Sequence, residues 1–139
     1  MVKEEIHNIC EKYGIKNYTI KSDGSINVVG SVYLSHNELT KIPIKFNKVR
    51  GSFYCSSNNL TSLKGSPERV RGSFDCVSNN LTSLQYSPEI VDGGFYCGGN
   101  TLESLDGYNG GYEKLYCDNK DGLILKHKRS KKLKLINEL

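Results

Sequence analysis

The sequence lacks several features that would each point to a particular class of protein. It has no tryptophan, one methionine and three prolines among 139 residues. No run approaches the roughly 18 to 20 consecutive apolar residues of a membrane span, and the charged beginning MVKEEIHNICEKYG is unlike the apolar core of a signal peptide. We therefore expect a soluble, cytoplasmic protein that forms one domain over residues 1–139.

Cysteine is present, but in a pattern that suits neither disulfides nor a metal site. The chain has five cysteines, an odd number, and no Cys-x-x-Cys pair. Four of them recur 20 or 21 residues apart: Cys55, Cys76, Cys97 and Cys117. On stacked parallel strands such side chains lie roughly 4.8 Å apart and point the same way, so they cannot converge on one zinc ion. We expect small buried thiols, no metal and no cofactor.

A catalytic constellation is also missing from the sequence. The three histidines, His7, His36 and His127, lie far apart in the sequence, and none recurs from one repeat to the next. The stretch DNKDG at 118–122 lacks the alternating acids and the distal glutamate of a calcium loop. We therefore expect a protein that is not an enzyme.

The sequence does contain a repeat with a period of 21 residues. GSFYCSSNNLTSL at 51–63 returns as GSFDCVSNNLTSL at 72–84 and as GGFYCGGNTLESL at 93–105. Apolar residues alternate within a unit, which predicts a short strand with Val49, Phe53 and Cys55 on one face. An Asn-x-Leu-x-x-Leu segment follows each strand. A strand this short cannot bury its apolar side alone, so the units must stack on one another.

Read as L-x-L-x-x-N-x-L, this spacing resembles the leucine-rich-repeat family, with Phe and Cys at positions usually held by Leu. The resemblance implies about five repeats over residues 30–122, parallel strands on a concave face, and an asparagine ladder at the turns. The period, with SPE at 66–68 and 87–89, is similar to short repeats encoded by bacteriophages, and the resemblance covers residues 15–117. The short return segment predicts an extended, polyproline-like back. No established activity is implied.

The segments outside the repeats are predicted to cap the solenoid. Apolar residues at helical spacing predict a helix over 2–13 that ends at Gly14, and KSDG predicts a hairpin over 17–29, so 1–29 form the N-terminal cap. Residues 123–139 are predicted to form a basic C-terminal cap, with one strand and a short helix. The residues expected to face inward in the two helices are Val2, Ile6, Ile9, Cys10 and Tyr13 in the first, and Leu133, Ile136 and Leu139 in the second.

One outward strand position is the candidate protein-binding site. It carries four tyrosines and one carboxylate: Tyr33, Tyr54, Asp75, Tyr96 and Tyr116. Tyrosine is a favoured interface anchor, so this stripe on the concave face predicts a protein-protein interaction module. The alternative is that tyrosine suits a strand and stacks on its neighbours for stability. Because the pattern resembles phage-encoded repeats, the expected partner is a host or bacterial protein, such as a defence component that the protein inhibits or redirects.

A basic segment near the C-terminus offers a second candidate surface. Six cations lie within nine residues: Lys126, Lys128, Arg129, Lys131, Lys132 and Lys134. Such a cluster could neutralise phosphates and bind nucleic acid or an acidic partner. The segment has no aromatic residue for base stacking, and a solvated face on a capping helix explains it equally well.

Overall fold

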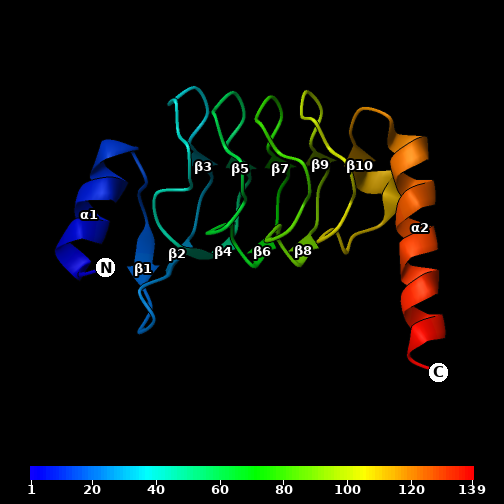
Figure 1. Cartoon of the computed structure of the whole chain (residues 1–139). Coiled ribbons are helices and arrows are strands. Elements are labelled where there is room, and N and C mark those ends of the chain that lie inside the picture. The colour runs from blue at the N-terminus through cyan, green and yellow to red at the C-terminus, as the bar shows by residue number, and fades with distance from the viewer.

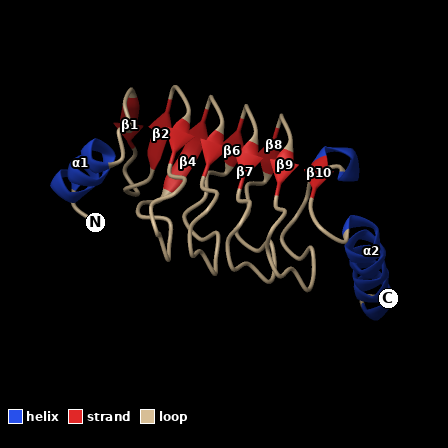
Figure 2. Ribbon diagram, turned by 90° about the horizontal axis from the view of Figure 1, so that it is seen from above, coloured by secondary structure: helices blue, strands red, loops and turns tan.

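Each 21-residue unit forms one coil of a parallel β-solenoid, as the repeat predicts. The computed structural model describes all residues 1–139 and contains about four turns of solenoid, with a helix at either end. The coils stand side by side in a row between helix α1 and helix α2 (Figure 1). In Figure 2 the strands gather along one side of the coils and the loops along the other.

Every full coil contributes two short strands, which build two separate five-stranded sheets. The first sheet contains β1 (Tyr18–Ile20), β2 (Ile26–Val28), β4 (Phe46–Val49), β6 (Arg69–Val70) and β8 (Ile90–Val91). The second contains β3 (Val32–Tyr33), β5 (Phe53–Tyr54), β7 (Phe74–Asp75), β9 (Phe95–Tyr96) and β10 (Leu115–Tyr116). All pairs are parallel except the β1–β2 hairpin. In the last coil a 3₁₀ turn, Tyr112–Lys114, takes the place of a first-sheet strand.

The prediction of one continuous strand through Val49, Phe53 and Cys55 was wrong, because the chain bends at the glycine between them. A Cβ on Gly51 would lie 2.3 Å from Ser31 Oγ and 2.7 Å from the backbone of Gly30. The chain therefore passes too close to the preceding coil for any side chain at this corner. All three apolar residues still point inward and are at most 1% exposed.

The core is a column of aromatic rings flanked by leucines and thiols. Phe53 and Phe74 stack with their ring centroids 5.5 Å apart, and Phe95 follows at 5.0 Å. Phe46 and Tyr108 close the column with edge-on contacts at its two ends. Because each ring packs on the ring of the next coil, the coils stabilise one another and no coil has a core of its own.

An asparagine ladder runs beside this column, as the resemblance implies. The Asn58 amide donates to Leu34 O of the preceding coil at 2.9 Å and to Cys55 O of its own coil at 3.1 Å. Asn58 Oδ1 accepts hydrogen bonds from the Asn37 and Leu39 backbone N–H groups, both at 3.0 Å. Asn79 and Asn100 repeat the pattern. The ladder thus satisfies backbone groups that the turns bury.

Helix α1 (Lys3–Lys12) closes the first end of the solenoid. Ile6 and Cys10 are buried, whereas Val2, expected to face inward, is 61% exposed because it precedes the helix. The helix ends as predicted at Gly14, whose φ is +65°. The N–H of Ile15 donates to Cys10 O and that of Gly14 to Glu11 O, the Schellman pattern.

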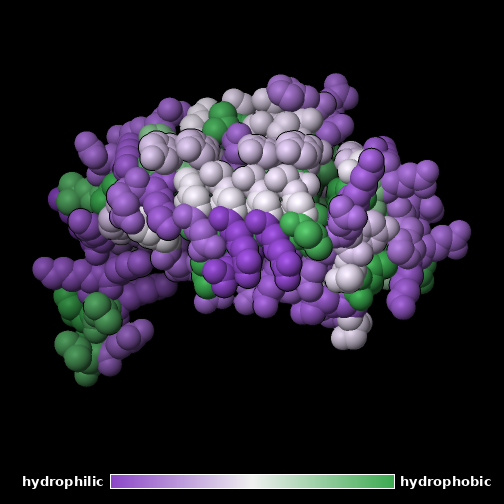
Figure 3. All heavy atoms as spheres, turned by 180° about the vertical axis from the view of Figure 1, so that it is seen from behind, coloured by the Kyte–Doolittle hydropathy of each residue, from purple (hydrophilic) through white to green (hydrophobic).

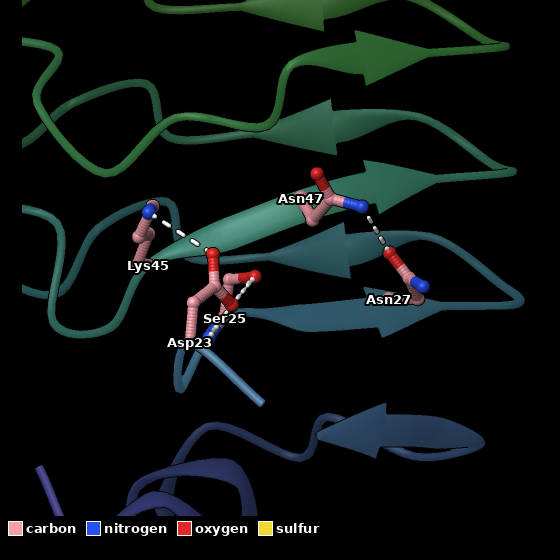
Figure 4. A network of polar contacts seen from close by, with 5 residues as sticks. All are labelled: Asp23, Ser25, Asn27, Lys45 and Asn47. Atoms are coloured by element: carbon pink, nitrogen blue, oxygen red, sulfur yellow. Dashed lines mark hydrogen bonds and ion pairs between the residues drawn. The ribbon is translucent and has the colours of Figure 1, made fainter. Parts of the chain in front are cut away.

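The β1–β2 hairpin joins this helix to the first coil. Its turn residue Asp23 accepts hydrogen bonds from the Ser25 hydroxyl and backbone N–H and pairs with Lys45 Nζ at 3.3 Å (Figure 4). The Ser25 bonds and Lys45 hold the pKa of Asp23 well below its usual value. The Asn47 amide, one coil further on, donates to Asn27 Oδ1 at 2.8 Å.

Helix α2 (Lys120–Asn137) closes the other end and differs from the prediction. It is a single helix of 18 residues, so the strand predicted within residues 123–139 is absent and the last strand of the chain is β10. Leu123 and His127 are buried, whereas Leu133, Ile136 and Leu139, expected to face inward, are 61%, 53% and 106% exposed. The first half of α2 covers the last coil, and the second half extends beyond the coils, with its apolar side chains in a green group at the lower left of Figure 3.

Candidate functional site

The second sheet brings all five candidate residues into one row on its outer face. Tyr33 pairs in register with Tyr54, and Tyr54 with Asp75. Asp75 pairs with Tyr96, and Tyr96 with Tyr116. We call this row the tyrosine face. Figure 3 shows the molecule from the strand side.

The four tyrosines form two stacked pairs. The rings of Tyr33 and Tyr54 lie 5.3 Å apart with 12° between their planes, and those of Tyr96 and Tyr116 lie 4.8 Å apart at the same angle. Tyr33 is 66% exposed and Tyr116 is 51% exposed, so a large part of each outer ring is open to a partner. Stacking also holds each ring in one orientation, which lowers the entropy lost on binding.

A row of serines, whose role the sequence analysis missed, supports this sheet. Ser52 N–H donates to Ser31 Oγ at 2.9 Å, and Ser73 N–H donates to Ser52 Oγ at 2.9 Å. Gly94 N–H completes the row with a bond to Ser73 Oγ at 3.2 Å. The Gly-Ser pair that recurs at 30–31, 51–52 and 72–73 was the signal that could have revealed it. These bonds fix the distance between coils, and with it the spacing of the tyrosine face.

The cysteine row lies in the core and does not form a reactive site. Cys55, Cys76 and Cys97 are at most 1% exposed, and all five thiols are free. Burial raises the pKa of these three thiols, so they stay protonated at neutral pH. The structure contains no group of three His, Cys, Asp or Glu residues placed to hold a metal ion.

The six cations of the basic segment lie on α2, but they do not share one face. At about 100° per residue, Lys126 and Lys128 point to nearly opposite sides of the helix. Lys126 Nζ donates to Glu103 O at 2.7 Å, and Lys128 lies over the Tyr112 ring at 5.4 Å. The segment is therefore partly used in holding α2 to the last coil.

His127 is a further buried residue that sequence analysis did not single out. It is 6% exposed, and both ring nitrogens lack a hydrogen-bond partner. Its ring lies edge-on to Tyr112 with the centroids 6.3 Å apart. Burial is the main cause that lowers the pKa of His127, and the positive charge of Lys131 lowers it further, whereas the negative charge of Asp106 acts in the opposite direction. His127 is therefore neutral at pH 7 when the protein is folded.

We predict that this histidine makes α2 packing sensitive to mild acid. Because its pKa is lower in the folded protein, the unfolded chain takes up the proton first as the pH falls below about 6.5. The free energy of unfolding should fall over this range and stop falling below the folded-state pKa. Urea titrations between pH 7.5 and 5.5 should show this loss in the wild type and a smaller loss in His127→Phe. Equal pH dependence in the two proteins would contradict the prediction.

The surface hollows are open depressions rather than enclosed pockets. The largest, of about 670 Å³, lies on the loop side between Met1, Lys41, Pro43, Lys64 and Tyr86. It contains no histidine, cysteine or acidic side chain that could act as a nucleophile or a general base.

Comparison with known proteins gave no match to this chain among family models, curated proteins or solved structures. Neither helix is long and apolar enough to cross a membrane.

Proposed function

We propose that this protein is a non-enzymatic interaction module that binds another protein through its tyrosine face. The observation that carries the proposal is the row of four tyrosines and one carboxylate, in register on five neighbouring strands, with three of the tyrosines exposed and Tyr54 half-buried. Tyrosines of this kind bury a large area with little loss of side-chain freedom. The resemblance to phage-encoded repeats suggests a host bacterial protein, such as a defence component, as the partner that is inhibited or redirected.

A matched set of variants tests this proposal. Replacing Tyr54 and Tyr96 by alanine removes one ring from each stacked pair, and should weaken binding of a purified partner at least tenfold. The partner is first identified by mass spectrometry after capture from a bacterial lysate, and its affinity is then measured by calorimetry. Tyr86→Ala is the control, because Tyr86 is 61% exposed on the loop side, away from the face.

Thermal unfolding of the same variants separates binding from stability. We expect the double variant to lose about 1 kcal/mol of unfolding free energy for each broken stack, and to remain folded. Unchanged affinity together with a lower melting temperature would show that the tyrosines serve stability alone, and would overturn the proposal.

A further inference from the structure

The tyrosine face contains a gap one ring wide at its centre. Within each stacked pair the ring separation, 5.3 or 4.8 Å, is close to the spacing of neighbouring strands, so the rings stack along the row of coils. Tyr54 and Tyr96 are the inner members of the two pairs, and they occupy the strands on either side of β7. Two strand spacings put them about 9.6 Å apart. Each therefore presents one ring face toward the coil of Asp75.

The side chain that lies in this gap is a carboxylate without a cationic partner. Asp75 accepts one hydrogen bond, from Val77 N–H to Oδ1 at 3.0 Å, which orients the carboxylate and leaves Oδ2 open. The two ion pairs of the structure, Lys45–Asp23 and Arg69–Asp92, lie elsewhere. A negative charge between two electron-rich ring faces attracts a positive group from outside the chain.

We infer that this gap binds an arginine side chain of the protein partner. A planar guanidinium needs about 7 Å between two flanking rings, at roughly 3.5 Å from each, and so enters without displacing either tyrosine. Its N–H groups reach the Asp75 carboxylate while its plane lies against a ring. A lysine ammonium has no plane to stack, and a neutral aromatic ring would leave the carboxylate unpaired.

The same face already holds one cation against a tyrosine ring. Lys120 Nζ lies 5.7 Å from the centroid of Tyr116, at the end of the row next to α2. The contact is made by the chain itself, whereas the central gap has no cation of its own. The inference rests on the proposed function, since the arginine belongs to the partner of that face.

A small probe tests the gap without any partner. N-acetyl-arginine N-methylamide is titrated into the protein, and the ring resonances of Tyr54 and Tyr96 are followed by NMR. The control probe is the citrulline analogue, which has the same shape but no charge. We expect saturable shifts with the arginine probe and binding at least tenfold weaker with the citrulline probe. Equal shifts with both probes, or none with either, would overturn the inference.

Two substitutions at one position make the test specific. Asp75→Asn keeps the side-chain shape and the hydrogen bond from Val77 N–H but removes the charge. It should lower the affinity for the arginine probe about tenfold. Asp75→Tyr fills the gap with a fifth ring and should abolish the shifts. Far-ultraviolet circular dichroism and melting curves check that both variants are folded. Unchanged arginine binding by folded Asp75→Asn would show that the carboxylate plays no part.

The purified partner separates this inference from the function on which it rests. If the Tyr54/Tyr96 double variant no longer binds the partner and Asp75→Asn binds it with full affinity, the proposed function is supported and the inference of an arginine in the gap is wrong. If Asp75→Asn lowers the affinity for the partner about tenfold, and mutation of one partner arginine lowers it no further in that variant, the arginine inference is supported. If the double variant binds normally, the proposed function fails, and the probe titration still decides whether the gap takes arginine.

Discussion

Replacing Asn79 by leucine should lower the free energy of unfolding by about 3 kcal/mol or more. The Asn79 amide donates to Cys55 O of the preceding coil at 3.0 Å and to Cys76 O at 3.1 Å, and its oxygen accepts from Leu60 N–H at 3.0 Å. Asn79 is 5% exposed, so water cannot replace these bonds. Leucine has a similar size, and the loss therefore reports unsatisfied buried backbone groups. Urea unfolding followed by circular dichroism measures it.

The matched control for this substitution is Asn37→Leu at the first rung of the ladder. Asn37 occupies the same repeat position, but it is exposed and its amide donates only to Leu34 O and Ser35 O. Water can reach these groups when the amide is removed, so we expect a loss below about 1 kcal/mol. Equal losses of unfolding free energy at the two positions would show that the contribution of a ladder asparagine to stability does not depend on its burial.

The second large effect is expected from a single methyl group at Gly72. A Cβ there would lie 2.2 Å from Ser52 Oγ and 2.9 Å from the carbonyl carbon and oxygen of Gly51. The backbone of the preceding coil cannot move away without breaking the Gly72 N–H to Gly51 O bond, which is 2.8 Å long. Gly72→Ala should therefore lower the free energy of unfolding by about 2 to 3 kcal/mol, measured by urea unfolding.

Gly30→Ala provides the opposite result at the equivalent position of the first coil. Nothing lies within 4 Å of a Cβ built on Gly30, because no coil precedes it on that side. We expect no loss and a gain of up to about 1 kcal/mol, since alanine reduces the freedom of the unfolded chain. A comparable loss in both variants would indicate an effect of backbone conformation and not of contact between coils.

The solenoid and most of its core could be predicted from the sequence because the repeat is regular. Period-two alternation and the 21-residue spacing predict which residues face inward, and Leu60, Leu63, Leu81 and Leu84 are fully buried. The same spacing predicts that the five residues of the tyrosine face share one surface. These features follow from local geometry repeated identically, so no long-range information is needed.

The arrangement of the ends depended on contacts that have no counterpart in the repeat. The charges of residues 126–134 suggested a solvated cap, but only packing against the last coil decides that Leu123 and His127 are buried and that Leu133 is exposed. The bend at Gly51 likewise depends on how closely one coil approaches the next. Neither the packing of α2 on the last coil nor the approach of one coil to the next can be read from a single segment of the sequence.

The sequence by itself determined a stacked solenoid, its phenylalanine and asparagine columns, and a row of four tyrosines interrupted by Asp75. Only the tertiary structure decided that these tyrosines form two pairs around an unpaired carboxylate. The physical reason is that alternation fixes the side of a strand on which a residue lies, whereas ring stacking depends on the spacing and side-chain rotamers of neighbouring coils.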